Sequence, residues 1–160
     1  MVENEETPWE TTLADMRSMA TELETAGWRT LSIVAGDTAP VSPADGPKAD
    51  DRLGLVHVVQ GIDADGLEEV VERCTLSRSE AYFAVVDGTE YVVTVVRDPD
   101  ERQAVLLAGA FDYRQAGDCF AAAIREDRIA TYIQRLDGTQ VAVFEHDDPT
   151  LFEPEQESTP

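Results

Sequence analysis

Two eighteen-residue segments of the chain, 82–99 and 132–149, align without a gap and share seven identical residues. Both contain Asp-Gly, at positions 87–88 and 137–138, between two runs rich in β-branched and aromatic residues. Asp-Gly favours the two-residue turn of a β-hairpin, because both turn positions take a positive φ that these residues tolerate. The chain is therefore constrained to fold around two antiparallel hairpins. Counting outward from the turns places Tyr82 opposite Val93 and Tyr132 opposite Val143.

Each hairpin completes a longer pattern, which is strand, helix, strand, strand over residues 53–99 and again over 103–149. Asp63 and Asp112 are the predicted N-caps of the two helices. Two explanations remain open. One is a duplicated β-α-β-β unit, and the other is two hairpins that converged on similar turns.

An earlier helix is predicted from its end signals. Thr7 is the expected N-cap, Pro8 the first helical residue and Glu10 the partner that completes a capping box. Apolar residues then recur with helical spacing, and Gly27 supplies the left-handed residue that ends the helix. A short strand over 28–34 is expected to follow.

These elements predict an α/β-type (α+β) fold, as one domain over 9–153 with an antiparallel or mixed sheet of about seven strands. The three helices are expected mainly on one face. Residues 35–52 contain three prolines and no apolar period, which predicts a long loop. Residues 1–8 are expected to be an acidic lead, and 154–160 a disordered acidic tail.

The charge balance limits the classes of partner. Thirty-three Asp and Glu face twelve Lys and Arg, a formal net charge of -21, and Lys48 is the one lysine. Without a basic cluster to displace phosphate counterions, nucleic-acid binding is not expected. The longest apolar run, 104–111, is less than half a membrane span, and the acidic N-terminus is no export signal, so we expect a cytoplasmic protein that does not enter membranes.

The sequence offers few candidates for chemistry. Ser77-Arg78-Ser79-Glu80 lacks the glycines that expose a nucleophilic serine, and it is interpreted as a loop. Glu145-His146-Asp147-Asp148 contains ligand types, but neighbouring residues of an extended chain point to opposite faces, so no metal site is predicted. No cofactor motif is present.

Two functions from different classes remain. The first is a non-catalytic binding or regulatory module that contacts a protein partner or a second copy of itself. The alternative is a small-molecule-binding protein or an enzyme with a pocket at the seam between the two halves, lined by His57, Tyr82 and Tyr132. A filled seam together with an exposed apolar patch would favour the first.

Several segments together resemble an uncharacterised family of small acidic proteins from halophilic archaea. They are Trp9-Glu10 through Gly27-Trp28, Arg97-Asp98, Val105 to Ala110, Gln134 to Gly138 and His146 to Pro149. The resemblance covers most of residues 9–153. It implies a domain of unknown function from a halophile, and it supplies no activity, cofactor or site residue.

The acidic composition generates a prediction about salt. We expect the melting temperature to fall when potassium chloride is lowered from molar to about 0.1 M, because the Debye length grows from roughly 3 Å to about 10 Å and the carboxylates repel one another. Thermal melts across this range measure the effect. An unchanged or higher melting temperature at low salt would contradict it.

Overall fold

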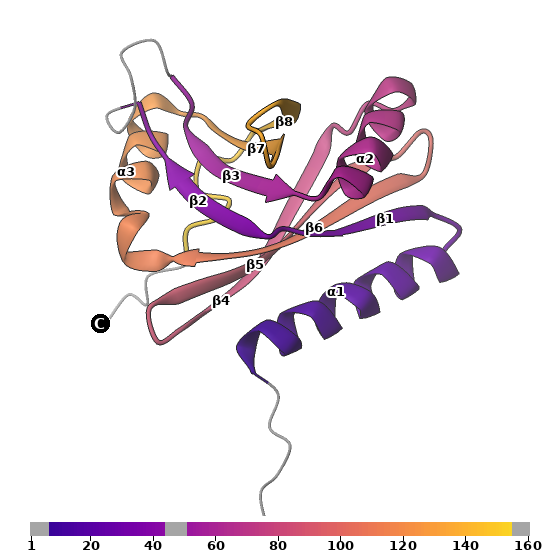
Figure 1. The fold of residues 1–160 in the computed structure, drawn as a ribbon, viewed down its shortest axis with the longest axis horizontal. Helices are drawn as coiled ribbons and strands as arrows, with labels where there is room; N and C mark the ends of the chain where they lie inside the picture. Colours follow the sequence, from indigo (N-terminus) through magenta and orange to yellow (C-terminus); the bar gives the residue numbers. More distant parts are fainter. Residues whose placement is uncertain (1–6, 44–50, 155–160) are drawn as a thin grey trace, which may run out of the picture.

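A computed structural model describes residues 7–43 and 51–154, which contain three α-helices and eight strands in two four-stranded sheets (Figure 1). The first sheet has the order β1 (Arg29–Val34), β6 (Gln103–Asp112), β5 (Thr89–Asp98), β4 (Arg78–Val86). The second has the order β2 (Asp37–Val41), β3 (Gly54–Val59), β7 (Ile129–Arg135), β8 (Gln140–His146). One sheet of about seven strands was expected. Most of the predicted acidic lead and tail lies outside the described residues.

Both sheets are mixed. In the first, β1 is parallel to β6, and in the second, β3 is parallel to β7, whereas the other pairs are antiparallel. The chain passes from one sheet to the other between β1 and β2. There the amide of Ala35 donates to Ala108 of β6 at 2.9 Å, and that of Gly36 donates to Val58 of β3 at 2.8 Å. Two adjacent residues thus join the sheets at one corner.

Helix α1 (Pro8–Thr25) covers the outer face of the first sheet along β1, β6 and β5 (Figure 1). Its predicted ends are confirmed. The Thr7 hydroxyl accepts from the Glu10 amide at 3.1 Å, and the Glu10 carboxylate accepts from the Thr7 amide at 2.9 Å. Gly27 has a φ of 95°, which lets the amide of Trp28 donate back to the carbonyl of Leu23 at 2.9 Å.

The other two helices lie at opposite ends of the layer between the sheets (Figure 1). Helix α2 (Gly61–Arg73) belongs to an apolar cluster, the α2 cluster, that contains Leu67, Val96 and Ile133. Helix α3 (Gly117–Glu126) belongs to the α3 cluster, with Phe120 and Val92. The expectation of helices mainly on one face was therefore wrong. No described helix is long and apolar enough to cross a membrane.

Strand β2 lies inside the segment predicted as a loop over 35–52. Pro40 argues locally against a strand, but β2 is at the edge of its sheet, where a missing N–H costs no ladder hydrogen bond. The tertiary pairing with β3 then decides the conformation. Residues 44–50 of the same segment lie outside the described part of the chain.

The hairpin predictions are confirmed residue by residue, since Tyr82 pairs with Val93 and Tyr132 with Val143. The helix starts were less accurate. Asp63 lies in the first turn of α2, whose N-cap is Gln60, and Asp112 caps the short 3-10 helix η1 (Tyr113–Gln115) rather than α3. Strand β6 continues to Asp112 and delays the start of α3.

The two halves, 53–99 and 103–149, repeat the order strand, helix, strand, strand but do not pair equivalently. The leading strand of the first half, β3, pairs with the first strand of the other hairpin, β7. The leading strand of the second half, β6, pairs with the second strand of the other hairpin, β5. A duplicated unit therefore stays a hypothesis that rests on the order of elements.

The sheets approach one another closely at Gly109 of β6. A Cβ atom there would overlap the hydroxyl of Thr38 and lie 2.8 Å from Cε1 of His57, both on the second sheet. Such distances are shorter than van der Waals contact, so the packing of the two sheets requires a residue without a side chain at this position.

We expect Gly109→Ala to lower the free energy of unfolding by about 1–3 kcal/mol, because the added methyl must push the second sheet away. Gly117→Ala is the matched control, since no atom lies within 4 Å of the Cβ that it adds. Denaturant unfolding in high salt compares the two. Equal stability of both variants would contradict the close approach.

Candidate functional site

A belt of polar side chains crosses the layer between the two sheets and separates the α2 cluster from the α3 cluster. We call it the polar belt, and its members besides Gly109 are Thr38, His57, Thr131 and His146 from the second sheet and Thr94 and Ser79 from the first. Along β3, β5, β6 and β7, the belt residue lies two positions from an apolar residue of each cluster. On β3, for example, His57 lies between Leu55 and Val59.

His57 occupies the inner part of the polar belt and is fully buried. Its Nδ1 lies 2.8 Å from the Thr38 hydroxyl. Among the described residues, its Nε2 and the hydroxyl of Thr94 have no hydrogen-bond partner. Burial lowers the pKa of His57 to about 3, so the ring is neutral at physiological pH.

His146 links the two sheets at the outer end of the polar belt. Its Nε2 lies 2.7 Å from the hydroxyl of Thr131, on the neighbouring strand of its own sheet. Its Nδ1 lies 2.7 Å from the hydroxyl of Ser79, on the first sheet. The ring of Phe152 packs edge-on against it at a centroid distance of 5.4 Å. Burial lowers the pKa of His146 to about 4, although nearby Asp147 acts in the opposite direction.

Ser79 and His146 open onto a polar cleft with a volume of about 570 Å³. The cleft is lined by two segments, 77–80 and 145–148, together with Arg97 and Leu151. Four carboxylates and two guanidinium groups line it, so its formal charge is negative. The described residues include no group of three or more His, Cys, Asp or Glu that is arranged to hold a metal ion.

The structure does not bring the three predicted pocket residues together. His57 is inside the polar belt, where the seam is filled. Tyr132 lies on the opposite face of the second sheet, 8% exposed, and its hydroxyl accepts from the Leu53 amide at 2.9 Å. Tyr82 lies on the outer face of the first sheet and is 47% exposed. Burial, and then the charge of Glu80, raises the pKa of Tyr82, which keeps its hydroxyl protonated.

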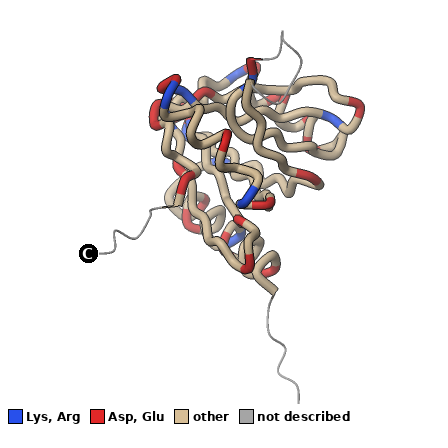
Figure 2. Tube along the Cα trace, turned by 90° about the vertical axis from the view of Figure 1, so that its left-hand side faces the viewer, with Lys and Arg blue, Asp and Glu red and all other residues tan. Residues whose placement is uncertain are grey.

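Tyr82 instead lines a groove of about 390 Å³ between α1 and β4. Helix α1 leaves the outer face of β4 open, and Tyr82 and Val86 on this face are each at least 36% exposed, as is Val85 on the other face of the same strand. This apolar exposure is unusual on a surface where acidic residues are spread over helices and loops and basic ones are few (Figure 2). An exposed apolar patch is the feature expected to favour a binding module over an enzyme, and this patch is at β4.

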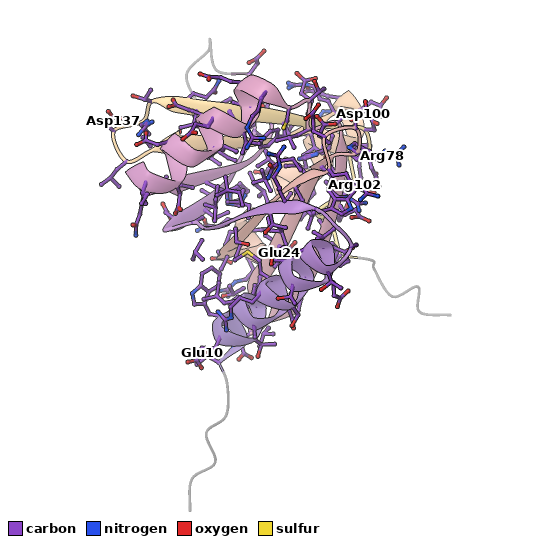
Figure 3. The ribbon with its side chains drawn as sticks, turned by 90° about the vertical axis from the view of Figure 1, so that its right-hand side faces the viewer. Glu10, Glu24, Arg78, Asp100, Arg102 and Asp137 are labelled. Atoms are coloured by element: carbon purple, nitrogen blue, oxygen red, sulfur yellow. The ribbon has the colours of Figure 1, made fainter. Side chains whose placement is uncertain are left out.

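Sequence reasoning missed the cleft although it considered both of its segments. Neither segment indicates a site by itself, because 77–80 lacks a nucleophile motif and 145–148 is a poor chelator. They meet because β4 begins where β8 ends, at edges of two different sheets, and no local pattern encodes that contact. Arg78, at the start of β4, extends outward on the opposite side of the view from Asp137 (Figure 3).

One further buried group has no described partner. Glu90 of β5 is 0% exposed, and neither carboxylate oxygen forms a hydrogen bond with the described residues. Burial raises the pKa of Glu90 to about 8. The neutral acid is therefore the form that the folded protein favours at neutral pH.

The buried titratable groups predict a stability maximum between acid and alkaline pH. The folded pKa values of His57 and His146 lie below the ordinary 6.5, so their contribution is complete above pH 6.5 and is lost as the pH falls toward 4. The folded pKa of Glu90 lies above the ordinary 4.5, so its contribution is complete below that value and is lost as the pH rises through about 8.

Glu90→Gln therefore should raise the free energy of unfolding at pH 8 by about 1–3 kcal/mol, with a smaller effect at pH 4.5. Denaturant unfolding at both pH values measures this difference. Glu72→Gln, at an exposed position of α2, is the control. An equal effect of the two variants at pH 8 would contradict the assignment of a buried acid.

Comparison with known proteins gives one match. A family model described as "Family of unknown function (DUF7529)" matches residues 1–154. No curated protein and no solved structure matches the chain. Since the family model spans nearly all of the sequence, the chain belongs to the family of unknown function DUF7529.

Proposed function

We propose that the protein is an interaction module that binds a segment of a partner polypeptide as an additional strand beside β4, at a surface that is itself non-catalytic. The observation that carries this proposal is the unprotected edge of β4. Among the described strands β4 pairs with β5 alone, and six consecutive residues, 81–86, carry no charge and no proline. Natural sheets usually protect such an edge with charges, proline or a bulge, because it offers unpaired N–H and C=O groups to any other chain.

The edge strands of the second sheet carry that protection. Pro40 interrupts the hydrogen-bonding edge of β2, and a charged Glu145 points outward from β8. The absence of a similar device over 81–86 supports a role for this edge in binding.

The groove beside β4 supports a partner of defined chemistry. Met19, Tyr82 and Val93 give it apolar walls. Asp15 lines the groove, and an adjoining pocket that shares Met19 and Tyr82 with it carries the carboxylates of Glu22 and Glu80 against the guanidinium of Arg97, so the charge balance is acidic. A segment with alternating apolar side chains and flanking lysines or arginines matches both features.

The alternative, an enzyme pocket formed by His57, Tyr82 and Tyr132, gains no support from where these residues lie. We also propose that the module acts in the cytoplasm of a halophilic archaeon. The net charge of -21 and the single lysine support this setting, because molar salt screens the repulsion that such a surface creates.

A synthetic peptide tests the binding proposal. It alternates valine and threonine and carries two lysines at each end, and its binding is followed by calorimetry. We expect the unchanged protein to bind this peptide, and Val85→Lys to weaken binding by about tenfold or more, because an added lysine blocks the edge. Val143→Lys is the matched control, since Val143 is 37% exposed on β8 and Val85 is 40% exposed on β4.

Three results would overturn the proposal: no binding, an equal loss in both variants, or equally strong binding of a peptide that carries glutamates in place of the lysines. Sedimentation of the protein alone tests whether a second copy of the chain occupies this edge. A dimer that Val85→Lys dissociates and Val143→Lys does not would show that this edge pairs with a second copy of the chain instead.

A further inference from the structure

The geometry of the polar cleft points to a second, independent site, at which the hydroxyl of Ser79 attacks uncharged or cationic esters with His146 as general base. It uses no residue of 81–86 and does not depend on the binding proposal. Its three groups form a chain of close polar contacts: Ser79 Oγ is 2.7 Å from His146 Nδ1, and His146 Nε2 is 2.7 Å from Thr131 Oγ1. A nucleophile, a base and a residue that orients the base are the parts that covalent catalysis requires.

The groups are held by regular strands rather than by loops. Ser79 is the second residue of β4, Thr131 lies within β7 and His146 ends β8. The imidazole of His146 is only 6% exposed and is fixed by a hydroxyl at each nitrogen and by Phe152 at its edge. Thr131 is fully buried and acts through its hydrogen bond with His146, so it is a positioning residue. Ser79 is half-buried and lines the cleft, where a substrate from solvent reaches it.

The protonation state of the base suits this arrangement. Because burial lowers the pKa of His146 to about 4, the ring is free to accept a proton throughout the neutral range. The same shift makes it a weak base, which restricts the reaction to esters with good leaving groups. In the productive tautomer, Nε2–H donates to Thr131 and Nδ1 accepts from Ser79.

The reaction balances with water as the second reactant. Ser79 Oγ forms a bond to the carbonyl carbon of the ester while its proton passes to His146 Nδ1. The bond from that carbon to the leaving oxygen then breaks, and His146 returns the proton to the leaving alcohol. Water, deprotonated by the same nitrogen, then attacks the acyl carbon. The bond from that carbon to Ser79 Oγ breaks, and His146 returns the proton to Oγ, which releases the acid and restores Ser79.

The charges of the cleft set the class of substrate. The carboxylates of Glu80, Glu145, Asp147 and Asp148 outnumber the guanidinium groups, so anionic esters are repelled and acidic products are expelled. Arg78 and Arg97 lie opposite one another on β4 and β5 and both line the cleft. Arg97 is paired with Glu80 at 2.9 Å, so the exposed Arg78 is the guanidinium available to the negative charge that develops on the carbonyl oxygen.

An uncharged fluorophosphonate probe tests the nucleophile, because it forms a stable bond to an activated serine and releases fluoride. Intact-mass and peptide mass spectrometry locate the adduct. We expect one adduct, on Ser79, in the unchanged protein and none in Ser79→Ala. Ser77→Ala is the matched control, since Ser77 lines the same cleft and it is Ser79 that contacts His146. The adduct on Ser79 should still form in this variant.

Thr131 variants separate positioning from stability. Thr131→Val keeps the shape of the side chain but cannot orient the ring, and we expect labelling to slow by roughly 100-fold, with recovery in Thr131→Ser. Circular dichroism and thermal melts establish that each variant is folded. The rate for the unchanged protein should be flat from pH 6 to 9, because the base is already neutral.

Each contrary result overturns the site. Absence of an adduct in the folded protein, or equal labelling of the protein in urea, would show that Ser79 only ties β4 to β8. A rate that rises tenfold for each pH unit would show attack without His146. If Thr131→Val is labelled as fast as the unchanged protein, Thr131 does not orient His146, and the site has no oriented base. Faster hydrolysis of an anionic than of a neutral nitrophenyl ester would overturn the substrate class.

Discussion

The fold depends on polar side chains that are buried between two sheets, where the nitrogens of His146 have hydrogen-bond partners and Nε2 of His57 has none among the described residues. A buried hydroxyl or imidazole without a hydrogen bond costs about 1–3 kcal/mol, and apolar packing alone would let the sheets slide over one another. The contact of His146 with Ser79 and the close fit of His57 over Gly109 fix their relative position at two separate points. The two apolar clusters on either side then supply most of the burial.

Local chemistry was enough to predict the elements whose ends depend on neighbouring residues. The capping box at Thr7 and the left-handed Gly27 bound α1 because both act within a single turn of helix. The cross-strand partner of Tyr82 followed from the Asp-Gly turn alone. Turn chemistry also explains part of the repeat: Asp98, Asp137 and Asp148 each accept a hydrogen bond from the amide two residues later.

The division into two sheets and the polar cleft could not be derived in this way. Pairing of β2 with β3 overrides the local signal of Pro40, and the contact of Ser79 with His146 joins residues 67 positions apart. The pattern of one polar residue among inward apolar ones on β3, β5 and β7 was visible in the sequence. The role of these polar residues between the sheets could not be predicted, because a polar residue on an inward face does not indicate which strand will supply its hydrogen-bond partner.

The exchange of strands between the halves has a consequence for how the chain folds. Because β1 pairs with β6, and β3 with β7, the first sheet cannot be completed before β6 (from residue 103) is present, and the second cannot be completed before β7 (from residue 129) is present. The contacts that close each sheet therefore span more than seventy residues, and such closures are entropically costly and slow. During synthesis β3 emerges long before its partner. Neither half contains a complete sheet of its own, so we expect the domain to fold as one cooperative unit only after β7 has been synthesised.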